Sequence, residues 1–174
     1  GNMRKVICVM SVSIVLCGCH LNDADRAKYD IQQEPIHLDR IDSLQGIDKD
    51  KNGIRDDIDE YIQNNFEDEK EQILVSNVAR NLQKSLTTDL TKSMQVLQVN
   101  KQLESSIIEL NNLFNNEDTH NNIFETLQSL TSNTGYRFAA SMSFSETVEK
   151  LRSQSYLNNQ PNSIKEALNA RQYH

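Results

Sequence analysis

The sequence contains no tryptophan, and only two prolines and five glycines occur in its 174 residues. So few glycines leave little room for the glycine-rich loops that hold nucleotide phosphates, and a chain with few glycines and prolines suits helices. The net charge is −7. Because nucleic-acid binding requires a basic surface that neutralises phosphates, this acidic balance argues against nucleic acid as the main partner. The length suits one domain with a tail.

All three cysteines lie in or at the end of an apolar leader. The leader begins with a short basic segment, Arg4 and Lys5, which is followed by an apolar run over residues 6–16. This run is too short for a membrane-spanning helix of about 20 residues, and it matches the central segment of a secretory signal. The leader therefore indicates export from the cytoplasm.

The leader ends in Leu16-Cys17-Gly18-Cys19, which resembles the lipobox of bacterial lipoprotein precursors. The resemblance implies cleavage before Cys19, which then carries the lipid and becomes the N-terminus. We therefore expect residues 1–18 to be a signal peptide, with residues 1–2 a cloning remnant. The expected location is the bacterial cell envelope, periplasmic or on the outer surface. The alternative is an ordinary secretory signal that leaves Cys19 as a free thiol.

Removal of residues 1–18 takes away Arg4 and Lys5 but no acidic residue, so the net charge changes from −7 to −9. The mature chain has no disulfide, and it must fold on its helices and on any ion that it binds. An acidic domain does not lie flat on anionic lipid, so we expect it to stand off the membrane. Residues 19–46 are polar and mixed in sign, and we interpret them as a lipid-attached linker that is flexible over about residues 20–34. Ile36, Leu38 and Ile41 could bring a short segment back onto the domain.

Residues 48–59 have the pattern of a calcium-binding loop. With Asp48 as position 1, side chains that carry oxygen occupy positions 1, 3, 5, 9 and 12, and Gly53 occupies position 6. Calcium takes about six to eight oxygen ligands, which a short loop can supply only by winding around the ion. The glycine permits the sharp turn that this winding needs. The predicted ligands are Asp48, Asp50, Asn52, Ile54 through its carbonyl oxygen, Asp56 and Asp59.

This spacing resembles an EF-hand loop, and more closely the loops of thrombospondin type-3 repeats and dockerins, which end in aspartate. Two positions depart from the EF-hand. Arg55 stands at position 8, where a paired EF-hand has an apolar residue, and Asp59 replaces the usual glutamate at position 12. Gly46 interrupts any entering helix, and no second loop of this kind is evident in the sequence. We expect a single loop with an exit helix that begins near Asp56.

The ion expected in this loop is Ca²⁺, bound with a Kd of about 10⁻⁴ to 10⁻³ M, as is usual for extracellular modules. Mg²⁺ is a weaker competitor, and zinc is disfavoured because every predicted ligand is a hard oxygen. The alternative is a solvated turn whose acidic residues only favour the start of a helix. We expect the ion to have a structural role.

Residues 47–174 are predicted to form an all-α domain, a multi-helix bundle that opens with the calcium loop. Apolar residues recur at helical spacing, while Glu67–Glu69 suits a helix start and residues 87–89 and 131–135 suit helix ends. The apolar faces expected to form the core are Ile54, Ile58, Tyr61, Ile62 and Phe66; Leu74, Val78, Leu82, Leu86, Leu90 and Met94; Leu103, Ile107, Leu110 and Phe114; and Ile123, Phe124, Leu127 and Leu130.

Residues 136–144 are the most compact apolar segment of the domain. We expect a buried helix there, with a short strand as the alternative. Ser143 and Glu146 match a capping box, which predicts that a new helix begins at this point. Ser163 and Glu166 match the same pattern and predict a last helix near the C-terminus.

The sequence does not carry a recognisable catalytic motif. No thiol follows Cys19, and neither G-x-S-x-G nor S-x-x-K occurs. Arg137, within the apolar segment, is a possible contact for an anionic ligand; the alternative is that it caps a helix end or pairs with a carboxylate. We therefore expect a protein that is not an enzyme.

The function expected from the sequence is that of a calcium-binding, lipid-anchored envelope protein with a structural or binding role. Its expected partners are the membrane, through the lipid, and a protein of the envelope. The main alternative is a helical binding or inhibitor module for a secreted or envelope partner, with calcium incidental. A hydrolase with an unrecognised carboxylate site is the third hypothesis.

Overall fold

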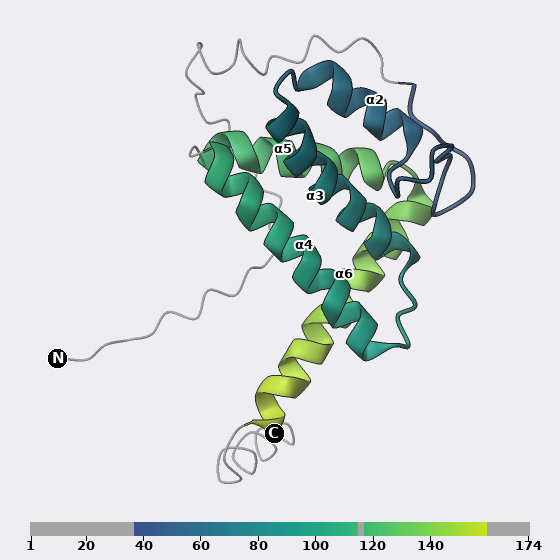
Figure 1. Cartoon of the computed structure of the whole chain (residues 1–174). Coiled ribbons are helices and arrows are strands. Elements are labelled where there is room, and N and C mark those ends of the chain that lie inside the picture. The colour runs from purple at the N-terminus through teal and green to yellow at the C-terminus, as the bar shows by residue number, and fades with distance from the viewer. Residues whose placement is uncertain (1–36, 115–116, 160–174) are drawn as a thin grey trace, which may run out of the picture. The chain divides into compact units, whose positions relative to one another are not determined.

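The structure is a computed structural model that describes residues 37–114 and 117–159. Its described residues form five α-helices and no strand, so the predicted all-α fold is confirmed (Figure 1). The signal peptide, Cys19 and the helix predicted after Ser163 lie outside the described residues. The helices are α2 (Asp56–Asn65), α3 (Glu69–Thr87), α4 (Ser93–Phe114), α5 (Glu117–Thr131) and α6 (Gly135–Asn158).

Helix α3 contacts each of the other four helices, and its most extensive contact is with α4. Figure 1 shows these two helices side by side. Asn81 donates a hydrogen bond to Ser106 Oγ (3.2 Å), and Lys84 donates to Gln102 Oε1 (3.1 Å). The α3 residue later in the chain, Lys84, contacts the α4 residue that is earlier in the chain, Gln102. The two helices therefore run antiparallel. The other helices therefore assemble around α3.

Helix α2 begins at Asp56, where the sequence predicts it. Its predicted apolar face is entirely buried, and α3 starts directly after the acidic residues that follow it. Asp68 is the N-cap of α3, and its carboxylate accepts from the amides of Lys70 (2.9 Å) and Glu71 (3.0 Å). This bonding satisfies amide groups that the first turn of a helix leaves without partners. The buried face consists of Ile54, Ile58, Tyr61, Ile62 and Phe66.

The break predicted at residues 87–89 is confirmed, because α3 ends at Thr87 and α4 begins at Ser93. The apolar stripe on α3 is buried at Val78, Leu82 and Leu86. Its continuation fails at Met94, whose side chain is 81% exposed. The first turn of α4 instead presents Met94 to solvent, and the core contact of α4 begins two residues later at Val96.

Residues 136–144 are helical as predicted, but the prediction that this segment is buried is wrong for most of its large side chains. Tyr136 and Phe138 are 56% and 57% exposed, and Met142 is also exposed. Helix α6 packs with a different face, which carries Phe144 and Val148. These two residues form a cluster with Val96 and Val99 of α4.

The predicted helix start at Ser143 and Glu146 is also wrong. Helix α6 runs without interruption from Gly135 to Asn158, and its N-cap is Thr134, whose side chain accepts from the Arg137 amide (3.2 Å). The carbonyl of Ser143 accepts a hydrogen bond from the Thr147 hydroxyl (2.7 Å) inside the helix. The capping pattern is short, and it also fits the exposed face of a continuous helix.

Candidate metal-binding site and the buried arginine network

Three of the predicted ligands converge in the loop that precedes α2. Asp48, Asp50 and Asp56 each offer a carboxylate oxygen, and these atoms lie within 4.8 Å of one another. Asp56 is the first residue of α2, and its amide donates to the carbonyl of Ile47 (2.9 Å), which joins the two ends of the loop. This group could hold a metal ion.

The loop winds tightly through two residues with left-handed backbone geometry, Lys51 (φ 59°) and Gly53 (φ 87°). A residue with a side chain adopts this geometry at a cost, and glycine adopts it freely. The Asp48 carboxylate lies inside the turn and accepts from the amides of Asn52 (3.1 Å) and Gly53 (3.0 Å). The position of Asp48 is therefore fixed by the loop backbone.

Asn52 links the carboxylate group to Asp59 on α2. Its Nδ2 donates to Asp50 Oδ2 (3.1 Å) and to Asp59 Oδ2 (2.7 Å), while its Oδ1 accepts from the Ile54 amide (2.8 Å). All five predicted side-chain ligands thus lie in one connected group. Metal ligation by these side chains and by the Ile54 carbonyl stays a prediction.

The acidic residues of this group repel one another. The pKa of Asp59 is raised, first by burial and then by the negative charges of Asp50 and Asp48. The Asn52 hydrogen bond and the positive charge of Arg80 act in the opposite direction. Lys49 contacts Asp56 (3.4 Å), but this lysine side chain is largely exposed, so the pair stabilises the group little. A cation among these carboxylates would relieve the repulsion.

Arg80 of α3 holds the loop from outside, and no sequence pattern indicates this role. Its Nε donates to the carbonyl of Asn52 (2.8 Å), and its Nη1 donates to Asn77 Oδ1 (2.9 Å). Arg80 lies two residues from both Val78 and Leu82 of the apolar stripe, and this spacing gives no indication of the contact. It joins the middle of the loop to the central helix.

Arg55, the residue that departs from the EF-hand at position 8, is fully buried with 0% exposure. Its guanidinium makes a two-point contact with Asp57, from Nε to Oδ1 (2.9 Å) and from Nη2 to Oδ2 (2.6 Å). It also donates to the carbonyls of Leu130 and Thr131, both at 3.2 Å, at the end of α5. The loop is therefore fastened to α5 through the side chain of Arg55.

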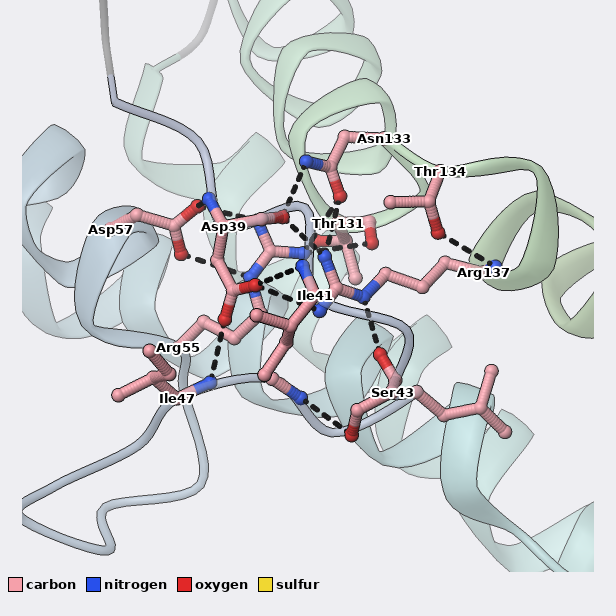
Figure 2. Close-up of polar contacts among 12 residues, drawn as sticks. Asp39, Ile41, Ser43, Ile47, Arg55, Asp57, Thr131, Asn133, Thr134 and Arg137 are labelled. Carbon is pink, nitrogen blue, oxygen red and sulfur yellow. Dashed lines mark hydrogen bonds and ion pairs between the residues drawn. The ribbon is translucent and has the colours of Figure 1, made fainter.

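Arg137 of α6 is the second fully buried arginine, and Figure 2 shows it beside Arg55. It donates to the carbonyls of Ser43 (2.9 Å) and Asp39 (2.6 Å), and it forms an ion pair with Asp39 Oδ1 (3.4 Å). The alternative that Arg137 pairs with a carboxylate is thus the one observed. Its guanidinium faces groups of the chain itself and is not exposed to solvent.

Asp39 connects the segment before the loop to both arginines. Its carboxylate accepts from the amides of Ile41 (2.8 Å) and Ile47 (2.7 Å), and its own amide donates to Asp57 Oδ2 (2.9 Å). Burial by itself raises the pKa of Asp39, but these amides and Arg137 outweigh it, and the pKa lies below its ordinary value. The ionised carboxylate is the form that fits this network.

No protein-family model matches the chain, and the searches of curated proteins and of solved structures likewise gave no match. Within residues 37–114 and 117–159, none of the helices has the length and apolar character needed to cross a membrane.

Proposed function

We propose that residues 48–59 bind Ca²⁺ and that the protein is a lipid-anchored component of the bacterial envelope in which this ion has a structural role. The observation that carries the proposal is the convergence of the Asp48, Asp50 and Asp56 carboxylates within 4.8 Å. Oxygen ligands of this kind are those that calcium prefers, and calcium tolerates irregular geometry better than magnesium does. The pattern of the loop supports the choice of ion.

Ligation by Asn52 requires one local change. Asn52 turns its Nδ2 toward Asp50 and Asp59, and an ion ligand must present an oxygen there. A rotation of the side-chain amide brings Oδ1 inward and breaks its bond to the Ile54 amide. The cation then takes the place of the amide donor between the carboxylates.

The ion would stabilise the junction between the N-terminal segment and the helices. The loop is bonded to α3 through Arg80 and to α5 through Arg55. Because a ligand that binds only the folded state stabilises it by mass action, calcium at this loop raises the free energy of unfolding. The result is a fixed attachment of the helical domain to the segment that leads to the lipid.

Thermal unfolding of the protein at millimolar CaCl₂ and in EDTA tests the metal site. We expect the melting temperature to rise by several degrees with calcium, and by less with magnesium. The double substitution Asp48→Ala with Asp50→Ala should abolish the rise. Asp42→Ala removes an exposed carboxylate outside the loop and should leave the rise intact. An equal melting temperature in calcium and EDTA for the unsubstituted protein would contradict the proposal.

The lipid anchor requires a separate test, because Cys19 lies outside the described residues. Bacteria that express the protein are grown with a fatty-acid analogue that can be labelled after isolation. We expect label in the unsubstituted chain and in Cys8→Ala, and none in Cys19→Ala. Label that persists in Cys19→Ala would refute lipid attachment at this residue.

A further inference from the structure

A polar hollow of about 680 Å³ lies between α3 and α4, and none of the predicted metal ligands lines it. Its size falls within the range of about 300 to 1,000 Å³ that is usual for sites of small ligands. Every residue that lines it is polar or charged, and one of them, Glu109, is acidic. A site with this lining offers hydrogen bonds and charge but no apolar side chain to a ligand.

Three cations line this hollow, namely Arg80, Lys84 and Lys101. In the part of the chain that the structure describes, none of the three forms a close ion pair, although the charge of Arg80 also acts on Asp59 of the loop. The whole chain nevertheless carries more acidic than basic residues. A local excess of positive charge within an acidic protein favours an anion at that place.

Arg80 is oriented for such a contact. Its Nε and Nη1 are held by Asn52 and Asn77, while its Nη2 has no hydrogen-bond partner among the described residues. A guanidinium with fixed orientation loses little conformational freedom when it binds a carboxylate or a phosphate. Lys84 lies one turn further along α3, and its Nζ contacts Gln102 Oε1 at 3.1 Å.

The side-chain amides and hydroxyls around the three cations indicate what kind of anionic ligand the hollow would bind. Gln98 and Ser105 also line the hollow, and they can donate and accept hydrogen bonds. Asn81 and Gln102 line it too, and after their bonds across the α3–α4 contact Asn81 keeps its Oδ1 acceptor and Gln102 its Nε2 donor. Hydroxyl groups of a ligand match such a lining, and no residue with an apolar side chain lines the hollow to hold the side chain of a peptide. We propose that the hollow between α3 and α4 binds an acidic oligosaccharide, whose anionic groups contact Arg80, Lys84 and Lys101.

Isothermal titration calorimetry of the full chain with trigalacturonic acid tests this site. Maltotriose supplies a neutral trisaccharide as a control, tetraglutamate an acidic peptide, and sodium sulfate an anion without hydroxyls. We expect the acidic trisaccharide to bind at least tenfold more tightly than any of the three. A sulfated trisaccharide in a parallel titration establishes whether carboxylate or sulfate is preferred. Failure of both acidic saccharides to bind, or binding of tetraglutamate or sulfate with equal affinity, would overturn the proposal.

Two pairs of substitutions locate the binding. The double substitution Lys84→Met with Lys101→Met should lower the affinity for trigalacturonic acid at least tenfold, because it removes two positive charges from the hollow. Lys70→Met with Lys150→Met removes two exposed lysines elsewhere and should leave the affinity unchanged. Circular dichroism confirms that both variants are folded. An equal loss of affinity in the two double variants would show that only the net charge of the protein matters, and this outcome would also overturn the proposal. Calcium is not required for this inference.

Discussion

Arg55 and Arg137 donate to the same side-chain oxygen, Oδ1 of Asn133, at 3.0 and 2.9 Å (Figure 2). Two buried guanidinium groups are thereby held side by side, although like charges repel. The pKa of Arg137 is lowered by burial and by the charge of Arg55. Asp39 and Asp57 supply the compensating negative charge, since each pairs with one of the arginines.

Asn133→Ala should destabilise the protein strongly. The substitution leaves one N–H of each arginine without its acceptor, and a hydrogen bond to a charged group contributes about 1.5 to 3 kcal/mol. We expect the free energy of unfolding, measured by urea denaturation, to fall by about 3 kcal/mol. Asn121→Ala, an exposed position on α5, should change it by less than about 0.5 kcal/mol. Similar small losses in both variants would show that the shared acceptor is dispensable.

The ionisation of Asp39 should make stability depend on acid pH. Its native pKa lies below the ordinary value, so the unfolded chain binds the proton first as the pH falls. The stabilisation is complete above about pH 4, near the unfolded pKa. It is lost as the pH falls from there through the lower native pKa.

Urea denaturation between about pH 6 and pH 2 checks the role of Asp39. The unsubstituted protein should lose stability more steeply below about pH 4 than Asp39→Asn does. Asp59 has a raised pKa and acts in the opposite direction, but it is present in both proteins and cancels in the difference. Parallel curves for the two proteins would contradict the prediction. Asp42→Asn, an exposed control, should follow the unsubstituted curve.

Glycine is required at two turns and replaceable at a third position. Gly46 has φ 70°, and a Cβ there would lie 2.8 Å from both Arg55 Cγ and Asp39 Oδ2. Gly53 has φ 87°, and its added Cβ would meet the flexible stem of Arg80 at 3.2 Å. We expect Gly46→Ala to cost more than about 3 kcal/mol and Gly53→Ala about 1 to 2 kcal/mol in thermal or urea unfolding.

Gly135→Ala is the matched control for these two substitutions. A Cβ at Gly135 meets nothing within 4 Å, and the residue begins α6, where alanine is the better helix former. The free energy of unfolding should stay the same or rise by up to about 1 kcal/mol. A loss in Gly135→Ala as large as that in Gly46→Ala would mean that close packing is not what distinguishes the sites.

Truncation of the two phenylalanines of α6 should change the stability by very different amounts. Phe144 is buried against Val96 and Val99, and Phe144→Ala should cost about 3 to 5 kcal/mol because it leaves a cavity. Phe138 is 57% exposed, and Phe138→Ala should change stability by less than about 1 kcal/mol. Chemical denaturation of both variants decides this. A large loss in Phe138→Ala would show that this side chain is covered in solution.

The sequence predicted most of what is local in this fold. Helical spacing located the buried face of α2, and the acidic residues before α3 located its start, because both signals arise within a few residues. The predicted capping box at Ser143 failed for the same reason. A four-residue pattern does not show whether the residues before it are already helical.

The contacts between distant residues could not be predicted in this way. Arg55 and Arg137 share an acceptor across 82 positions, and no periodicity relates two such residues. The loop pattern did predict the three carboxylates that converge, those of Asp48, Asp50 and Asp56, because they lie within nine residues of one another. Asp59, the fourth predicted carboxylate, joins them only through its hydrogen bond with Asn52. The exposure of Phe138 was missed since composition alone does not say which face of an apolar helix meets the core.

The attachment of Asp39 has a mechanical consequence. A pull on the chain from its N-terminal side reaches Asp39 before it reaches any described helix. Asp39 is bonded to Asp57 of α2 and to Arg137 of α6, two helices that lie far apart in the sequence. The pulling force is therefore divided between these two helices. Several bonds must then fail together, and the domain resists extension better than a chain that peels away one bond at a time.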